Sequence, residues 1–198
     1  MSAIERVEPM TLEEFARLYE QEGPFELIDG ERRLLMPPVA IHGFTIRALF
    51  LLLYNFCVTH NLGEVITEMP FVLTYDSNWV KGSRVPDLMF FAAARWQQYT
   101  QTTPDWQGKP FVIVPDLAVE VVSQNDQYTD IQDKVDRYLA DGVRLVWVVD
   151  PQRLRVGVYD GQHYVSLSVD ENLTGGDVLP GLSIALKTLF EMALGKQG

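Results

Sequence analysis

The sequence is poor in the residues that hold together small disulfide-rich or zinc-bound folds. Its 198 residues contain one cysteine and three histidines. A single thiol can form neither a disulfide within the chain nor a cysteine cage for zinc. That residue, Cys57, lies in an apolar run, 48–58, which predicts a buried thiol that acts as a small hydrophobe. The chain must therefore fold around an ordinary hydrophobic core, and its length suits one domain, 1–198.

Positive charge is also scarce. Lysine and arginine number 16 against 27 aspartates and glutamates, which gives a formal net charge of -11. This balance argues against a protein that coats nucleic acid, because phosphate contacts need clustered basic side chains. An enzyme is less constrained, since a metal ion can neutralise carboxylates locally while a few basic groups hold the substrate.

Long hydrophobic runs and a signal sequence are missing as well. The longest apolar stretch, 48–58, is about half the length that a membrane-spanning helix requires, and it contains Asn55. The N-terminus lacks the basic start and apolar core of a signal peptide. We therefore expect a cytoplasmic protein with no membrane segment.

What is present is a regular alternation of helix and strand signals. Thr11 and Glu14 form the pattern of a capping box before a helix at 12–20, and Asp29-Gly30 predicts a tight hairpin turn. The other expected helices, from apolar spacing, are 41–60 (apolar on most sides and expected to be buried), 128–140 and 183–194. The expected strands are 25–28, 31–36, 64–75, 85–91, 116–123, 143–149, 155–159 and 163–167, with 97–109 as an exposed excursion.

This order predicts an α/β fold of mixed α+β type. A central mixed β-sheet should be flanked by helices, with extra β-hairpins attached. The core should cover about 25–167, and the C-terminal helix about 183–194. We find no internal repeat and no linker that would divide the chain.

Two acidic residues interrupt strands that otherwise predict burial. Glu120 lies within a run of leucine, alanine and valine, where an ionised carboxylate is costly unless a cation or a donor compensates. Asp87 begins the neighbouring apolar run and follows Pro86, which suits the first position of a strand. Acids on adjacent strands can share one ion, and carboxylate oxygens favour Mg²⁺ or Mn²⁺.

Lys134 lies on the helix that follows the strand of Glu120. It is four residues from both Asp130 and Tyr138, so the three side chains should share one face of that helix. A lysine beside a metal-bound carboxylate cluster could orient the attacking water or stabilise charge on a phosphate.

Simpler interpretations exist for each of these residues. An aspartate after proline is common turn chemistry, and Glu120 could be the structural partner of an arginine. Lys134 could be a solvated residue paired with Asp130.

An ordered set of motifs resembles the Uma-type restriction endonuclease family of the PD-(D/E)XK nuclease superfamily. The motifs are 85–87, 119–123, 130–138 and 142–151, with 26–31 and His42 as an N-terminal signature. The resemblance spans roughly 12–164 and is specific as an ordered set. It implies a restriction-endonuclease-like fold and a hydrolase that cuts DNA phosphodiester bonds with Mg²⁺ or Mn²⁺. It also implies a homodimer, in which two sites related by two-fold symmetry cut both strands.

The resemblance also assigns roles to residues. It implies that Asp87, Glu120 and Lys134 are catalytic and that the two acids hold the metal. The superfamily motif E-X-K would place lysine at position 122, where this chain has Val122. Lys134 would then be its substitute from the following helix, and the backbone carbonyl of Val122 could still bind the metal.

His42, Glu31 and Tyr138 are possible accessory residues. By the resemblance His42 lines the mouth of the site, and the hydroxyl of Tyr138 could meet a phosphate. The simpler interpretations are a helix-capping histidine, an acid after a hairpin turn and a partly buried tyrosine. Glu26 would be a solvent-facing strand residue.

Two other function classes remain open. A catalytically inactive nuclease-fold protein that binds or regulates is compatible with the negative charge. An enzyme for a small phosphorylated metabolite is a third possibility, but no glycine-rich phosphate loop supports it. Metal binding would separate the nuclease from the inactive relative.

Overall fold

The computed structural model describes residues 5–6, 9–76, 78–124 and 126–195. The chain forms two compact units from six alternating segments. The first unit comprises 1–37, 68–86 and 97–114, and the second comprises 38–67, 87–96 and 115–198. Each unit has its own sheet and its own core. Because the segments alternate, neither unit is one continuous stretch, and a single domain stays a prediction.

The first unit contains an antiparallel five-stranded sheet in the order β1-β3-β2-β6-β5. Its elements are β1 Glu5–Arg6, α1 Leu12–Glu22, β2 Phe25–Ile28, β3 Glu31–Leu34, β5 Phe71–Thr74 and β6 Val80–Arg84. The predicted capping box is confirmed, because Thr11 and Glu14 exchange backbone and side-chain hydrogen bonds. The predicted turn is confirmed too, since Asp29 and Gly30 both have positive φ angles.

The second unit contains a mixed six-stranded sheet in the order β11-β10-β9-β8-β7-β4. Its strands are β4 Gly63–Thr67, β7 Leu88–Ala92, β8 Leu117–Val121, β9 Leu145–Asp150, β10 Arg155–Tyr159 and β11 Tyr164–Ser168. Only the central pair, β8 and β9, is parallel among these described strands. A separate hairpin follows, formed by β12 Asn172–Gly175 and β13 Leu179–Ala185. The predicted mixed sheet with extra hairpins is confirmed.

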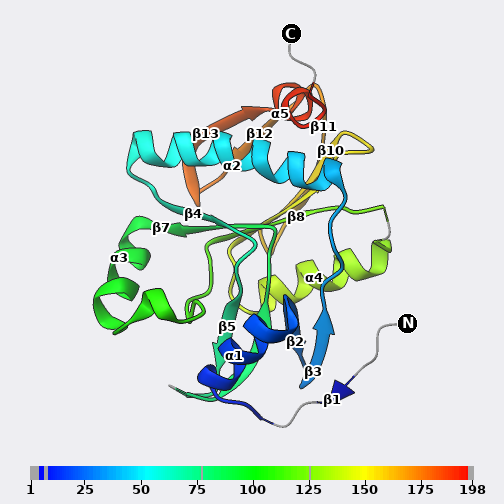
Figure 1. The fold of residues 1–198 in the computed structure, drawn as a ribbon. Coiled ribbons are helices and arrows are strands. Elements are labelled where there is room, and N and C mark those ends of the chain that lie inside the picture. The colour runs from blue at the N-terminus through cyan, green and yellow to red at the C-terminus, as the bar shows by residue number, and fades with distance from the viewer. Residues whose placement is uncertain (1–4, 7–8, 77, 125, 196–198) are drawn as a thin grey trace. The chain divides into compact units, whose positions relative to one another are not determined.

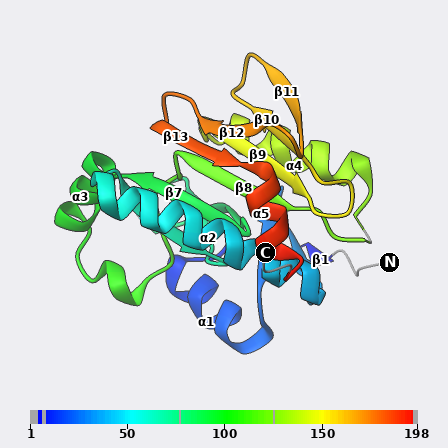
Figure 2. The same ribbon diagram turned by 90° about the horizontal axis from the view of Figure 1, so that it is seen from above.

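Helices cover both faces of the six-stranded sheet (Figures 1 and 2). The helices α2 Ala40–His60 and α5 Leu186–Ala193 pack on one face, and α4 Tyr128–Ala140 lies on the other. Successive residues of β8 point to opposite faces, so Val119 and Val121 enter the core with α2 and α5. Glu120 therefore points toward α4. Cys57 of α2 is buried in this core as predicted, and burial raises the pKa of its thiol to about 11.

Two predicted strands differ from the structure by more than small shifts of their ends. The predicted strand 64–75 is in fact two strands, β4 and β5, which belong to different sheets. Glu68 has a positive φ angle and Pro70 lacks an amide hydrogen, so the backbone cannot continue straight between them. The predicted strand 85–91 begins only at Leu88, and β6, which precedes it, was not predicted.

The connecting segments also hold more structure than expected. Residues 97–109 include the second half of α3 Ala93–Thr102 and a short 3₁₀ helix, Trp106–Gly108, and Tyr99 is buried. The terminal helix begins at 186 rather than 183, because 179–185 form β13.

The long helix α2 differs from its prediction in two ways. It is not buried on most sides, since several large apolar side chains on one face are exposed. Among the described residues it is also the one helix long and apolar enough to cross a membrane, with mean hydropathy 1.5. Of that window, 39% is buried inside the protein.

Candidate active site

The two acids singled out in the sequence lie at neighbouring strands, because Asp87 directly precedes β7 and Glu120 lies in β8. In the antiparallel pair β7 and β8, Leu88 is the partner of Val119. Extending this register by one residue places Asp87 opposite Glu120. Directly opposed residues of an antiparallel pair point to the same face of the sheet. By this register, the Cα–Cβ bonds of both acids point to the face that α4 covers.

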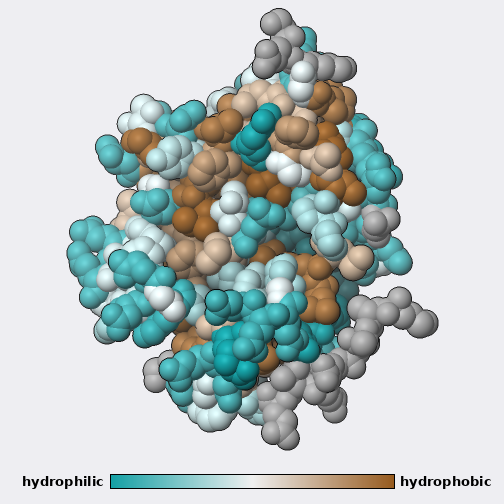
Figure 3. Space-filling model, in the orientation of Figure 1, coloured by the Kyte–Doolittle hydropathy of each residue, from teal (hydrophilic) through white to brown (hydrophobic). Residues whose placement is uncertain are grey.

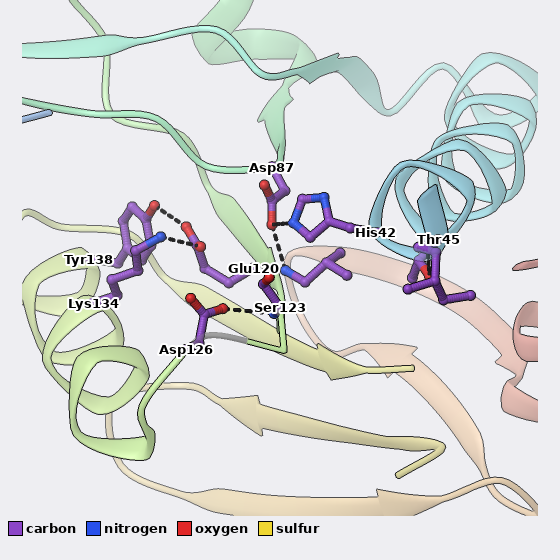
Figure 4. A network of polar contacts seen from close by, with 10 residues as sticks. His42, Thr45, Asp87, Glu120, Ser123, Asp126, Lys134 and Tyr138 are labelled. Atoms are coloured by element: carbon purple, nitrogen blue, oxygen red, sulfur yellow. Dashed lines mark hydrogen bonds and ion pairs between the residues drawn. The ribbon is translucent and has the colours of Figure 1, made fainter. Parts of the chain in front are cut away.

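Asp87 is held in place by a backbone amide and a histidine. Its Oδ2 accepts a hydrogen bond from the amide of Val121 at 2.6 Å and lies 3.2 Å from Nε2 of His42. His42 comes from the first turn of α2, and its side chain is 10% exposed, against 17% for Asp87. The structure thus brings His42 to the first acid, as Figure 4 shows.

Glu120 is buried, and each of its oxygens receives a donor from α4. The ammonium of Lys134 lies 2.7 Å from Oε2, and the hydroxyl of Tyr138 donates to Oε1. The two donors are one helical turn apart, so they lie on one face as predicted. The side chain of Glu120 is 4% exposed, and a buried carboxylate of this kind requires such partners. Figure 4 shows this carboxylate turned toward α4, and Asp87 toward His42.

The local sequence explains why α4 lies above Glu120. Ile131 and Val135 are buried and pack α4 against the sheet, which leaves Lys134 half-buried at the edge of that contact. The connection from β8 is fixed by the amide of Ser123, which donates to Oδ2 of Asp126 at 2.7 Å. The amphipathic pattern of the helix therefore determines where the lysine points.

The backbone at the end of β8 supplies a further oxygen. The amide of Val122 donates to the carbonyl oxygen of Val149 on β9 at 2.8 Å. In a trans peptide the carbonyl of the preceding residue points the opposite way, and the described chain has no cis peptides. The carbonyl of Val121 therefore points toward the side of β7 and Asp87. Val122 as a metal ligand stays a prediction, and the peptide geometry favours Val121 instead.

The remaining predicted residues belong to the first unit. Glu31 begins β3, and its Oε2 lies 3.8 Å from a guanidinium nitrogen of Arg33. Glu26 is buried, in contrast to the solvent-facing position expected for it. Its Oε1 accepts a hydrogen bond from the amide of Val85 at 3.1 Å, so it holds β2 to the segment after β6.

One buried acid was not singled out in the sequence. Asp116 precedes β8, and its side chain is fully buried. Its Oδ2 accepts a hydrogen bond from the amide of Ala92 at 2.9 Å. Its Oδ1 lies 2.9 Å from Arg95 and 3.5 Å from Arg144. The one available signal was its position, an acid after a proline and directly before an apolar strand.

The site offers few metal ligands, all of them oxygens. Among the described residues no cluster of three or more histidine, cysteine or acidic side chains could hold a metal. The available donors are the carboxylates of Asp87 and Glu120 and the carbonyl of Val121. Within the described residues, Oδ1 of Asp87 accepts no hydrogen bond. Such a set fits Mg²⁺, which keeps several waters and needs only one or two carboxylates from the protein.

Comparisons with known proteins support this interpretation of the fold. A family model described as "Uma2: Putative restriction endonuclease" matches residues 12–187. The chain is also similar to the crystal structure of a "putative nuclease belonging to DUF820" from Anabaena variabilis ATCC 29413. That match has a TM-score of 0.75 and 22% sequence identity, and it covers 93% of this chain and 99% of the other. No curated protein matches the chain.

Proposed function

Since the chain belongs to the Uma2 family, we propose that it is a Mg²⁺- or Mn²⁺-dependent endonuclease that hydrolyses phosphodiester bonds in DNA. The observation that carries the proposal is the pair of acids with a cation beside it. Asp87 directly precedes β7, which pairs with the strand of Glu120, and Lys134 contacts Glu120 at 2.7 Å. Two carboxylates and a positive group for a phosphate are thus available beside β7 and β8.

In this proposal Asp87, Glu120 and the carbonyl of Val121 hold the ion. When bound, Mg²⁺ would polarise the phosphodiester and activate an attacking water. The amide of Val121 and the imidazole of His42 orient the carboxylate of Asp87 from two directions. Tyr138 orients the carboxylate of Glu120, to which its hydroxyl donates. Both acids are therefore positioned before a substrate arrives.

Lys134 supplies a positive charge beside Glu120. Its ammonium is a group of three donors and contacts Glu120. An ammonium group in a site of low exposure can stabilise the negative charge that develops on a phosphate in the transition state. We assign this role to Lys134, in place of the lysine that position 122 lacks.

The test is a plasmid cleavage assay with Mg²⁺ or Mn²⁺, combined with calorimetric titration of Mn²⁺. Glu120→Gln and Asp87→Asn should lose metal binding and cleavage, because each removes a charged ligand. Asp133→Asn is the matched control, since it removes an exposed acid from α4 that contacts neither of these acids. Chelation by EDTA should abolish cleavage by the wild type.

The second candidate is a catalytically inactive relative that binds or regulates. The outer face of α4 favours it, because Asp130, Asp133 and Asp136 are all exposed there and would repel phosphates. A wild type that binds no Mn²⁺ and cuts no DNA would overturn the nuclease proposal and support this candidate. Cleavage that survives both substitutions would instead show that the activity lies elsewhere.

A further inference from the structure

The exposed face of α2 carries a continuous row of large side chains. We call Phe44, Arg47, Leu51, Tyr54 and Val58 the α2 stripe. Its four apolar members are between 41% and 56% exposed, although the opposite side of the same helix is buried in the core. Figure 3 shows apolar surface gathered over this helix. The core already accounts for the buried side, so the stripe needs a separate explanation.

The spacing of the stripe is that of a helix-pairing seam. Its members follow one another at intervals of three, four, three and four residues, which is the a and d pattern over two heptads. The 21 residues of α2 span about 31 Å, enough for both heptads to contact one partner helix.

The stripe is complementary to itself when two copies are antiparallel. A two-fold axis at Leu51 places that residue against its own copy and Phe44 against Val58 of the second copy. Arg47 then faces Asn55 of the second copy, next to Tyr54, rather than another arginine. Its guanidinium already lies 4.9 Å from the centre of the Phe44 ring in this chain. A guanidinium in this place can also stack on the Tyr54 ring of the second copy. Such an interface is isologous, as a two-fold dimer requires.

Charge also favours a second copy at this surface. The chain carries a net charge of -11, so two copies repel each other over most of their surfaces. Residues 32–63 contain no aspartate or glutamate, and α2 lies wholly within this segment. A lipid surface fits less well, because insertion of α2 would remove Leu49 and Leu53 from the core, where they are fully buried.

We propose that the α2 stripe is the contact surface of a homodimer, in which two α2 helices pack antiparallel about an axis at Leu51. The proposal is independent of the nuclease activity.

The experiment is sedimentation velocity at micromolar concentration. Wild type should be a dimer, and Leu51→Glu should raise the dissociation constant about thirtyfold or more, because two carboxylates would meet at the axis. Leu51→Lys should do the same, whereas an equimolar mixture of the two variants should dimerise again.

Val165→Glu is the matched control, since this valine is 51% exposed on β11 and lies outside the stripe. It should leave the dimer intact. A monomeric wild type, or a Leu51→Glu variant that dimerises like the wild type, would overturn the proposal.

Cysteine cross-linking tests the antiparallel arrangement. Leu51→Cys should form a disulfide-linked dimer on oxidation, and a mixture of Phe44→Cys with Val58→Cys should form a linked heterodimer. Phe44→Cys alone should stay unlinked, and efficient linking of this variant would indicate parallel helices and contradict the proposal. Flotation with phosphatidylcholine and phosphatidylglycerol vesicles covers the alternative partner, because a monomer that floats would identify a lipid surface instead.

Discussion

Two buried acids close together in the sequence have different sets of partners. Asp116 precedes β8 and Glu120 lies four residues further along the chain, and both are almost inaccessible to solvent. Asp116 is held by the amide of Ala92 and by two arginines, Arg95 and Arg144. Two donors of Glu120, Lys134 and Tyr138, are side chains from one helix.

The difference separates a structural acid from a candidate ligand. A backbone donor cannot be removed without moving the chain, so Asp116 ties the end of β7 to the start of β8 permanently. Side-chain donors can rotate away, so the oxygens of Glu120 can exchange a lysine for a metal ion. Burial alone would have marked both residues as functional. The nature of the donor is what distinguishes them.

The largest expected effect is on stability, from Asp116→Ala. This change leaves the amide of Ala92 without its charged acceptor and removes two ion pairs. We expect the free energy of unfolding to fall by about 3 kcal/mol, near the lower limit for breaking a buried pair, because both arginines are partly exposed. Urea denaturation measures the change. A loss under about 1 kcal/mol would remove the distinction between the two acids.

The next effect is on activity, from Lys134→Ala. If the ammonium stabilises the transition state, cleavage should slow about a hundredfold or more, which corresponds to roughly 2 to 4 kcal/mol. The fold and Mn²⁺ binding should persist, in contrast to Glu120→Gln. The assay is plasmid cleavage, with Arg137→Ala as a control that removes another cation from α4. If wild type and Lys134→Ala cut at equal rates, the role given to Lys134 is wrong.

A smaller effect is expected for Tyr138→Phe. The change removes the hydroxyl that donates to Glu120 but keeps the buried ring. We expect a loss of about 1 kcal/mol in stability and a decrease in cleavage of about tenfold or less, because one oriented oxygen loses its donor. Thermal unfolding and the cleavage rate can be measured on the same sample. An unchanged cleavage rate would limit Tyr138 to packing.

The smallest effect is expected for Arg144→Ala. This arginine is 52% exposed and 3.5 Å from Asp116, so solvent screens the pair. We expect a change in stability of about 0.5 kcal/mol or less. Urea denaturation checks it, and a loss equal to that of Asp116→Ala would mean that the arginine, rather than the backbone amide, secures the acid.

Local signals in the sequence predicted those elements that depend on local chemistry. The capping box of α1, the Asp29-Gly30 turn and the limits of α4 all follow from side chains within a few residues of each other. These features need no knowledge of distant partners.

Elements that depend on distant partners could not be predicted. The strand β6 contains lysine, glycine, serine and arginine, a composition that is typical of a loop. Its Ser83 and Arg84 are buried because they bond to the backbone of Leu27, 56 and 57 residues away. Asp116 was overlooked for the same reason, since its arginines come from α3 and from the residue before β9.

The six alternating segments have a consequence for how the chain is made on the ribosome. The pairing of Leu27 with Ser83 cannot form until β6 has left the exit tunnel. The second unit cannot be completed until its last segment, 115–198, has been synthesised. Contacts between residues so far apart in sequence form slowly. A nascent chain therefore carries two unfinished sheets at once, and a truncated product would expose unpaired strand edges to aggregation.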